Sequence, residues 1–191
     1  MKHRLPTLDG KRESRSEHRH AERAHDWAAR PTERLPLVPR VVAVAHVNQF
    51  AASARLAEQL CAAFTRESAT VAALITVDTP ASTDEAKLAF TGMMEAGARQ
   101  AKLLRKPERD VSNVILHAIE ELATVDWIIA WGNVVPQLFK PYFTIVVTGH
   151  RRDLTHADPL VIQAELEVTA PGPELAMLVA RRLAGEPNPE R

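Results

Sequence analysis

The chain of 191 residues has a single cysteine, Cys61, so it cannot form an internal disulfide bond. No apolar run approaches the roughly 20 residues that a membrane-spanning helix needs. The N-terminal residues have no apolar core, which argues against a secretory signal. The formal net charge is zero, so no overall charge steers the protein to nucleic acid or to acidic lipid. These absences predict a cytoplasmic protein that binds neither nucleic acid nor membrane, with Cys61 buried and unreactive.

The first 40 residues are poor in Ile, Val and Phe and rich in charge. They contain ten Lys or Arg, six Asp or Glu and four of the eight histidines. Such a segment cannot bury enough apolar surface to order itself, so residues 1–36 are expected to form a mobile basic tail, with Trp27 as its anchor for a partner protein. No cysteine or carboxylate at ligand spacing accompanies the histidines, and no metal site is predicted. The folded domain is expected to span residues 37–185, followed by a C-terminal tail at 186–191.

From residue 40 onward, apolar runs typical of buried strands alternate with amphipathic helices. Strands are predicted at 40–47, 70–77, 99–105, 126–131, 143–149 and, more weakly, 164–168. Helices are predicted at 51–65, 84–97, 108–123 and 173–184. The third helix carries the apolar stripe Val111, Val114, Ile115, Ala118, Ile119 and Leu122, and the last helix carries Leu175, Leu178, Val179 and Leu183. This alternation predicts a three-layer α/β/α fold with a mostly parallel sheet.

Polar residues follow the predicted strands, where ligands bind in parallel sheets. The expected ligand-binding residues are His46, Asn48, Gln49, Ser53, Asp78, Asn133 and Arg151. The candidate catalytic residues are His46, Asp78, His150 and Asp153, because a histidine beside a carboxylate can act as an acid–base pair. A structural alternative is that His46 bonds a loop carbonyl and Asp78 caps the helix that follows it.

Several segments resemble the P-loop family of the molybdopterin-guanine dinucleotide biosynthesis adaptor protein B, the small GTP-binding partner in molybdenum cofactor assembly. In that family a strand runs into G-x-x-x-x-G-K-[ST], and the same frame here reads HVNQFAAS, residues 46–53. The family's AGA turn is matched at residues 96–98. Its next strand, glycine and Lys-Pro loop are matched by DWIIAWGNVVPQLFKPYFTIVVTG, residues 126–149. The resemblance covers residues 40–150 and implies a P-loop NTPase-like fold.

The residues that hold phosphate in this family are missing from the frame. His46 and Ala51 stand in place of the two glycines, and Ala52 stands in place of the lysine. Ser53 keeps a hydroxyl that could reach magnesium, but Trp131 replaces the acidic residue that ends the fourth strand. Glycine lets backbone N–H groups wrap the phosphates, and lysine neutralises the charge of phosphoryl transfer. The sequence therefore predicts a degenerate phosphate loop that does not bind GTP and magnesium in the family's way.

These departures favour a non-hydrolysing adaptor or accessory protein in cofactor biosynthesis or enzyme maturation. It would bind a partner protein, together with a small ligand that the sequence does not name. Two alternatives stay open: a GTP-binding protein of molybdenum cofactor biosynthesis, and an enzyme with a rebuilt His/Asp site at the strand ends. A homodimer also stays open. Trp131 and Phe50 would either stack on a flat ligand or fill the space that a ligand would occupy.

Overall fold

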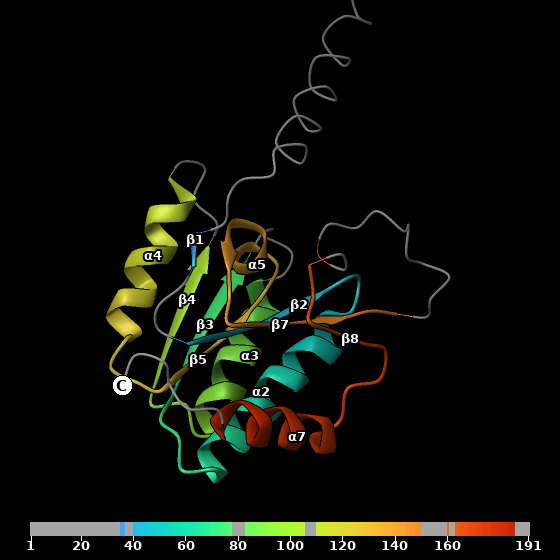
Figure 1. Ribbon diagram of the computed structural model, residues 1–191. Helices are drawn as coiled ribbons and strands as arrows, with labels where there is room; N and C mark the ends of the chain where they lie inside the picture. Colours follow the sequence, from blue (N-terminus) through green and yellow to red (C-terminus); the bar gives the residue numbers. More distant parts are fainter. Residues whose placement is uncertain are drawn as a thin grey trace, which may run out of the picture. The chain divides into compact units, whose positions relative to one another are not determined.

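The computed structural model describes residues 35–36, 40–77, 83–105, 110–149, 160 and 163–185. In this part of the chain, the larger sheet has six strands, all of them parallel, and helices lie on both of its faces (Figure 1). The predicted three-layer α/β/α architecture is therefore confirmed. No described helix is long and apolar enough to cross a membrane.

The strands follow the apolar runs of the sequence closely. They are β2 (Val41–His46), β3 (Val71–Val77), β4 (Gln100–Arg105), β5 (Trp127–Trp131), β7 (Phe143–Val147) and β8 (Leu166–Val168), in the spatial order β4-β3-β5-β2-β7-β8. Every residue of the three central strands β2, β3 and β5 is buried, as expected of parallel strands covered on both faces. Two short strands, β1 (Leu35–Pro36) and β6 (Phe139–Lys140), pair in parallel as a second sheet. The first of them lies within the segment that the sequence assigned to the tail.

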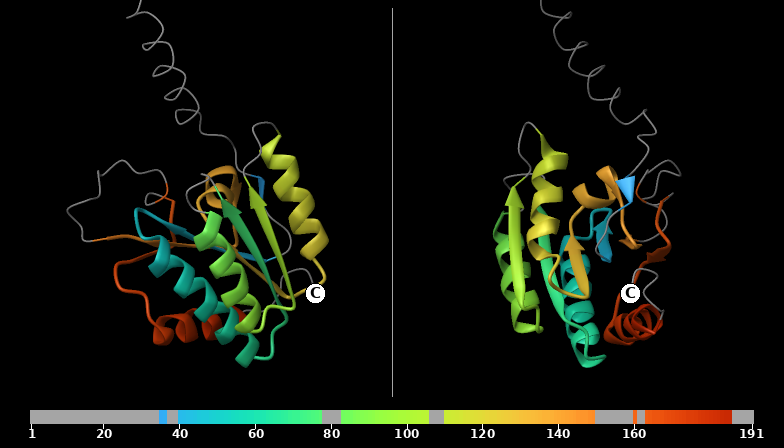
Figure 2. Two further views of the ribbon diagram at one scale, coloured as in Figure 1. Left: turned by 180° about the vertical axis from the view of Figure 1, so that it is seen from behind. Right: turned by 60° about the vertical axis from the view of Figure 1, so that its left-hand side comes forward.

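The helices divide between the two faces according to the direction of each crossover. The connections from β2 to β3 and from β3 to β4 run one way across the sheet, and they place α2 (Phe50–Arg66) and α3 (Thr83–Glu95) on one face, where α7 (Pro173–Ala184) also packs. The connections from β4 to β5 and from β5 to β7 run the other way, and they place α4 (Val111–Leu122) and α5 (Val134–Leu138) on the opposite face (Figure 2). Right-handed crossovers require this division.

This topology creates a divergence beside β5, at the carboxyl ends of the strands. β5 lies between β2 and β3 in the sheet. The chain leaves β2 and β3 toward the face of α2 and α3, but it leaves β5 toward the face of α5. In open parallel sheets, such a divergence opens the crevice in which ligands bind. The ends of β2 and β5 are therefore the place to look for a site.

Most predicted core positions are buried, but one predicted position on each of two helices is exposed. Ile119 is buried in the layer between α4 and the sheet, as predicted. Val114, however, is 38% exposed, and Leu178 is 66% exposed, so neither belongs to the buried face expected of it. The buried residues of α7 are Ala176, Val179, Ala180 and Leu183. The helix packs closely through small alanines, whereas the prediction gave most weight to the largest apolar side chains.

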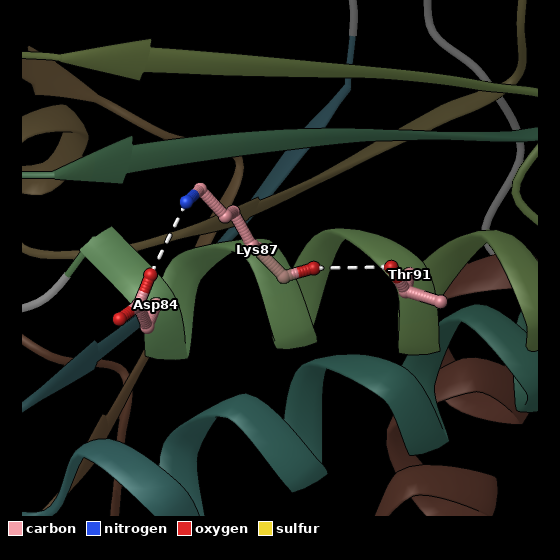
Figure 3. A network of polar contacts seen from close by, with 3 residues as sticks. All are labelled: Asp84, Lys87 and Thr91. Atoms are coloured by element: carbon pink, nitrogen blue, oxygen red, sulfur yellow. Dashed lines mark hydrogen bonds and ion pairs between the residues drawn. The ribbon is translucent and has the colours of Figure 1, made fainter.

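Local features of α2 and α3 agree with the sequence. Gly97 follows α3 with φ +108, as expected of a glycine at the C-terminal end of a helix. Cys61 is fully buried in α2, and burial raises the pKa of its thiol to about 12, which makes it unreactive as predicted. Figure 3 shows the exposed side of α3, where Lys87 bonds Asp84 and the Thr91 hydroxyl donates to the Lys87 carbonyl. Exposed contacts of this kind contribute little stability.

Candidate functional site

The site is built where the end of β2 and the end of β5 lie under the first turn of α2. Side chains alternate between the two faces along a strand. On β5, Trp127 and Trp131 point to the face that α2 covers, and on β2, Val44 and therefore His46 share that face. The register pairs Val44 with Trp131. Two ring side chains from strands far apart in sequence are thus brought together beneath α2.

A hydrogen-bonded chain links β5 to the start of α2. The indole Nε1 of Trp131 donates to Oγ of Ser53 over 2.9 Å, and that hydroxyl donates to the carbonyl of Phe50 over 2.8 Å. Both Trp131 and Ser53 are buried. The hydroxyl that a P-loop would offer to magnesium is therefore engaged on both sides within the protein.

The rings of His46, Phe50 and Trp131 form a packed group, referred to below as the aromatic cluster. The ring centroids of His46 and Phe50 are 3.9 Å apart, and each of these rings lies 6.2 Å from the Trp131 ring. Trp131 is buried, so of the two interpretations left open by the sequence the geometry agrees with the one in which it fills space. Phe50, at 39% exposure, forms the outer surface of the cluster.

His46 is the chemically unusual member of the cluster. It is only 6% exposed, and its buried Nδ1 has no hydrogen-bond partner. Burial lowers the pKa of the imidazole to about 4, so the ring is neutral at neutral pH. A neutral imidazole with so low a pKa is a weak general base, and the arrangement does not favour the acid–base role considered for His46.

The Asn133 side chain ties the end of β5 to the end of β2. Its Oδ1 accepts from the backbone N–H of His46 over 3.0 Å, and its Nδ2 donates to the His46 carbonyl over 3.1 Å. The amide is thus used at both ends within the protein, although the sequence placed Asn133 among the ligand-binding residues. Its observed role is to hold the backbone of His46 in position under α2.

Thr76 and Gly132 complete the support of the cluster. The Thr76 hydroxyl donates to the carbonyl of Trp131 over 3.2 Å, which connects β3 to the end of β5. Gly132 has φ +114, and a Cβ there would collide with the backbone and side chain of Thr76. Sequence reasoning missed Thr76, because nothing in the run TVAALITV distinguishes it from other strand residues.

The loop between β2 and α2 is short and carries the remaining predicted residues. It consists of residues 47–49, since β2 ends at His46 and α2 begins at Phe50. Asn48 is exposed and has φ +55, a conformation that asparagine tolerates better than most residues. Gln49 occupies the N-cap position but makes no side-chain cap, and the first turn of α2 has no acidic residue. The first amide groups of α2 therefore have no cap from the side chain at the N-cap position.

A separate small groove lies between α4, α5 and the ends of β3 and β4. Its volume is about 10 Å³, and its lining is Thr76, Leu104, Arg105, Val111, Val114, Ile115 and Val134. Small-molecule pockets usually span roughly 300–1,000 Å³, so this groove is too small for a nucleotide.

Five predicted residues, Trp27, Asp78, His150, Arg151 and Asp153, lie outside the described residues. Of the predicted site, the structure brings His46, Ser53 and Asn133 together and places Asn48 and Gln49 in the adjoining loop. Within the described ranges, no group of three or more His, Cys, Asp or Glu residues could hold a metal ion.

Comparison with protein-family models, with curated proteins and with solved structures finds no match to this chain. The interpretation of the site therefore depends on its residues and their geometry.

Proposed function

We propose that this chain is a non-hydrolysing, P-loop-like adaptor or accessory protein in cofactor biosynthesis or enzyme maturation, and that it acts by binding a partner protein. The resemblance of HVNQFAAS and of residues 126–149 to the adaptor family supports the pathway. The geometry beneath α2 supports the loss of nucleotide chemistry.

The observation that carries the proposal is the hydrogen bond from Trp131 to Ser53. Trp131 occupies the sequence position of the acidic residue, and its indole N–H engages the hydroxyl that would contact magnesium. Relative to the family, the tryptophan at position 131 removes the carboxylate, and its indole N–H also occupies the Ser53 hydroxyl. To bind a nucleotide with magnesium, the protein would have to break this buried bond and move the ring aside.

The charges around the site also support the loss of nucleotide binding. A nucleoside triphosphate needs cations beside its outer phosphates. The first turn of α2 has Ala51 and Ala52 where the family has glycine and lysine. Burial lowers the pKa of His46, and among the described residues no neighbouring charge contributes to this shift. The described surroundings of the cluster thus offer uncharged groups and no compensating lysine.

The test is calorimetric titration with a non-hydrolysable GTP analogue in the presence of magnesium. We expect no saturable heat from the unaltered protein. A variant with His46→Gly, Ala51→Gly, Ala52→Lys and Trp131→Asp restores the family's residues and should gain measurable affinity. Leu178→Lys places a lysine on an exposed position of α7, away from the site, and serves as the control for the added lysine of Ala52→Lys; it should not bind.

Micromolar binding by the unaltered protein would contradict the proposal and favour the GTP-binding alternative. The partner itself can be sought by co-purification from the native cell with mass spectrometry of bound proteins and small molecules. Recovery of the protein with a nucleotide and no protein partner would likewise argue against an adaptor.

A further inference from the structure

Two independent features at the N-terminus of α2 favour the binding of an anionic ligand. The helix has 17 residues, so the partial positive charge at its start is fully developed. The amides of Phe50, Ala51 and Ala52 precede the first intrahelical bond, in which Ser53 N–H donates to the Gln49 carbonyl over 3.0 Å. Gln49 makes no side-chain cap and the first turn has no acidic residue, so no side chain of the described first turn accepts from these donors.

The second feature is the unsatisfied nitrogen of His46, whose ring packs against the first residue of this turn. The imidazole packs against Phe50, the first residue of α2, with ring centroids 3.9 Å apart. Its Nδ1 is buried and has no hydrogen-bond partner, and His46 as a whole is only 6% exposed. Buried polar atoms are nearly always paired, so an unpaired one is a place where a water, an ion or a ligand group can supply the missing hydrogen bond.

We propose that the first turn of α2 binds a carboxylate of the partner protein, held by the amides of Phe50–Ala52 and by Nδ1 of His46. The inference rests on the proposed function in one respect: it assigns the ligand to a protein. Because Nδ1 is buried, the proposal requires the Phe50 ring, 39% exposed, to turn outward, where it would pack against the partner. Aromatic side chains that are half-exposed in the free protein are typical anchors of protein interfaces.

Among the described residues of the cluster and the loop before α2 there is no Lys or Arg, which favours a carboxylate over a phosphate. A carboxylate carries one negative charge, which two or three amides and the end of a helix can stabilise. A phosphate group of a nucleotide carries more charge, which phosphate loops offset with a lysine and a metal ion. Ala51 and Ala52 provide neither, and a neutral imidazole donates a hydrogen bond without adding charge.

The proposal can be tested by NMR on the full chain, with acetate as the smallest carboxylate probe and inorganic phosphate as the comparison. Each anion replaces chloride at constant ionic strength and neutral pH, so that general screening does not change. We expect acetate to shift the amide signals of Phe50, Ala51 and Ala52 saturably, together with the ring nitrogen signal of His46. The amides of α7, whose first turn already contains Glu174, serve as the internal reference and should not saturate.

Two variants identify the groups that bind. Gln49→Asp supplies an internal carboxylate to the same amides, and His46→Leu removes the imidazole nitrogen, with His46→Met as a second variant if the first does not fold. Each should raise the Kd for acetate at least about tenfold, as expected for loss of one charge-assisted hydrogen bond. Gln100→Asp adds the same charge at the exposed start of β4 and should leave the Kd unchanged.

Three results would overturn the proposal. These are an absence of saturable shifts with acetate, saturation by phosphate at lower concentration than by acetate, and unchanged acetate affinity in both His46 variants. None of them depends on whether GTP binds, so a failure here leaves the calorimetric test of the proposed function standing. Conversely, a protein that binds both acetate and GTP would retain this site and lose the proposed function.

Discussion

Acid should destabilise this protein through His46, and the structure gives the size of the effect. Burial lowers the pKa of His46 from 6.5 to about 4 in the folded protein. The unfolded chain therefore takes up a proton at higher pH than the folded protein does. The stability that comes from the neutral ring is fully present above pH 6.5, and it is lost as the pH falls through the window from 6.5 to about 4.

The magnitude follows from linkage. Each tenfold difference in proton affinity is worth 1.36 kcal/mol, so the whole fall in pKa corresponds to on the order of 3 kcal/mol. Between pH 7 and pH 4.5, the contribution of His46 to the free energy of unfolding should decrease by about 2 to 3 kcal/mol. That is a large part of the stability of an ordinary domain.

The assay is urea unfolding followed by tryptophan fluorescence at pH 7 and at pH 4.5, for the unaltered protein and for His46→Gln. The variant is expected to lose about 2 to 3 kcal/mol less over this interval, because glutamine does not titrate. Glu58, whose pKa is raised mainly by burial, responds in the opposite sense, but it is common to both proteins and cancels in the comparison. His117→Gln is the matched control, since the His117 side chain is exposed on α4.

Equal losses of stability for the unaltered protein and for His46→Gln would refute the reasoning. Such a result would mean that His46 is reached by water or by a counter-charge in solution, and that the aromatic cluster does not exclude solvent as the structure indicates. An equally large effect in His117→Gln would show that the difference does not come from burial.

Three further predictions concern stability. Ile119→Ala should cost on the order of 2–5 kcal/mol through lost burial and a cavity, whereas Leu178→Ala should change urea stability by less than about 0.5 kcal/mol; equal costs would mean that α4 or α7 is rotated in solution. Gly132→Ala should cost about 3 kcal/mol or more, because its positive φ and its contact with Thr76 leave no room for a methyl group; a neutral thermal shift would contradict that contact. Asn48→Gly should be nearly neutral and Asn48→Val should cost about 1–2 kcal/mol, since φ +55 disfavours branched side chains; similar melting temperatures for the two variants would show that the loop relaxes.

The order of strands and helices could be predicted because each signal is local. The β-branched runs before residues 47 and 77 and the helical periodicity of residues 51–65 depend on neighbours within one element. The short elements β1, β6 and α5 were missed for the same reason: they have two, two and five residues, too few to show a period. Their conformation depends on pairing and packing with distant segments.

Which face of a helix is buried is harder to predict from sequence than whether the segment is helical. In α7 the leucines suggested one face, but the sheet side and α2 are contacted by Ala176, Val179, Ala180 and Leu183. A local pattern contains apolar residues on more than one side, and the distance between packed layers decides which side is buried. That distance is not a property of the helix alone.

The sequence by itself determined that the stretch HVNQFAAS, between a strand and a helix, contains neither glycine nor lysine. It did not determine what the side chains of this stretch contact. Trp131 and Ser53 are 78 residues apart, and their hydrogen bond exists because β5 is inserted beside β2 in a register that places Trp131 under α2. The burial of the His46 nitrogen and the two hydrogen bonds from the Asn133 side chain to the His46 backbone arise because the same two strands are adjacent. Local preference fixes which segments become strands, but only the packed sheet decides which side chains meet at their ends.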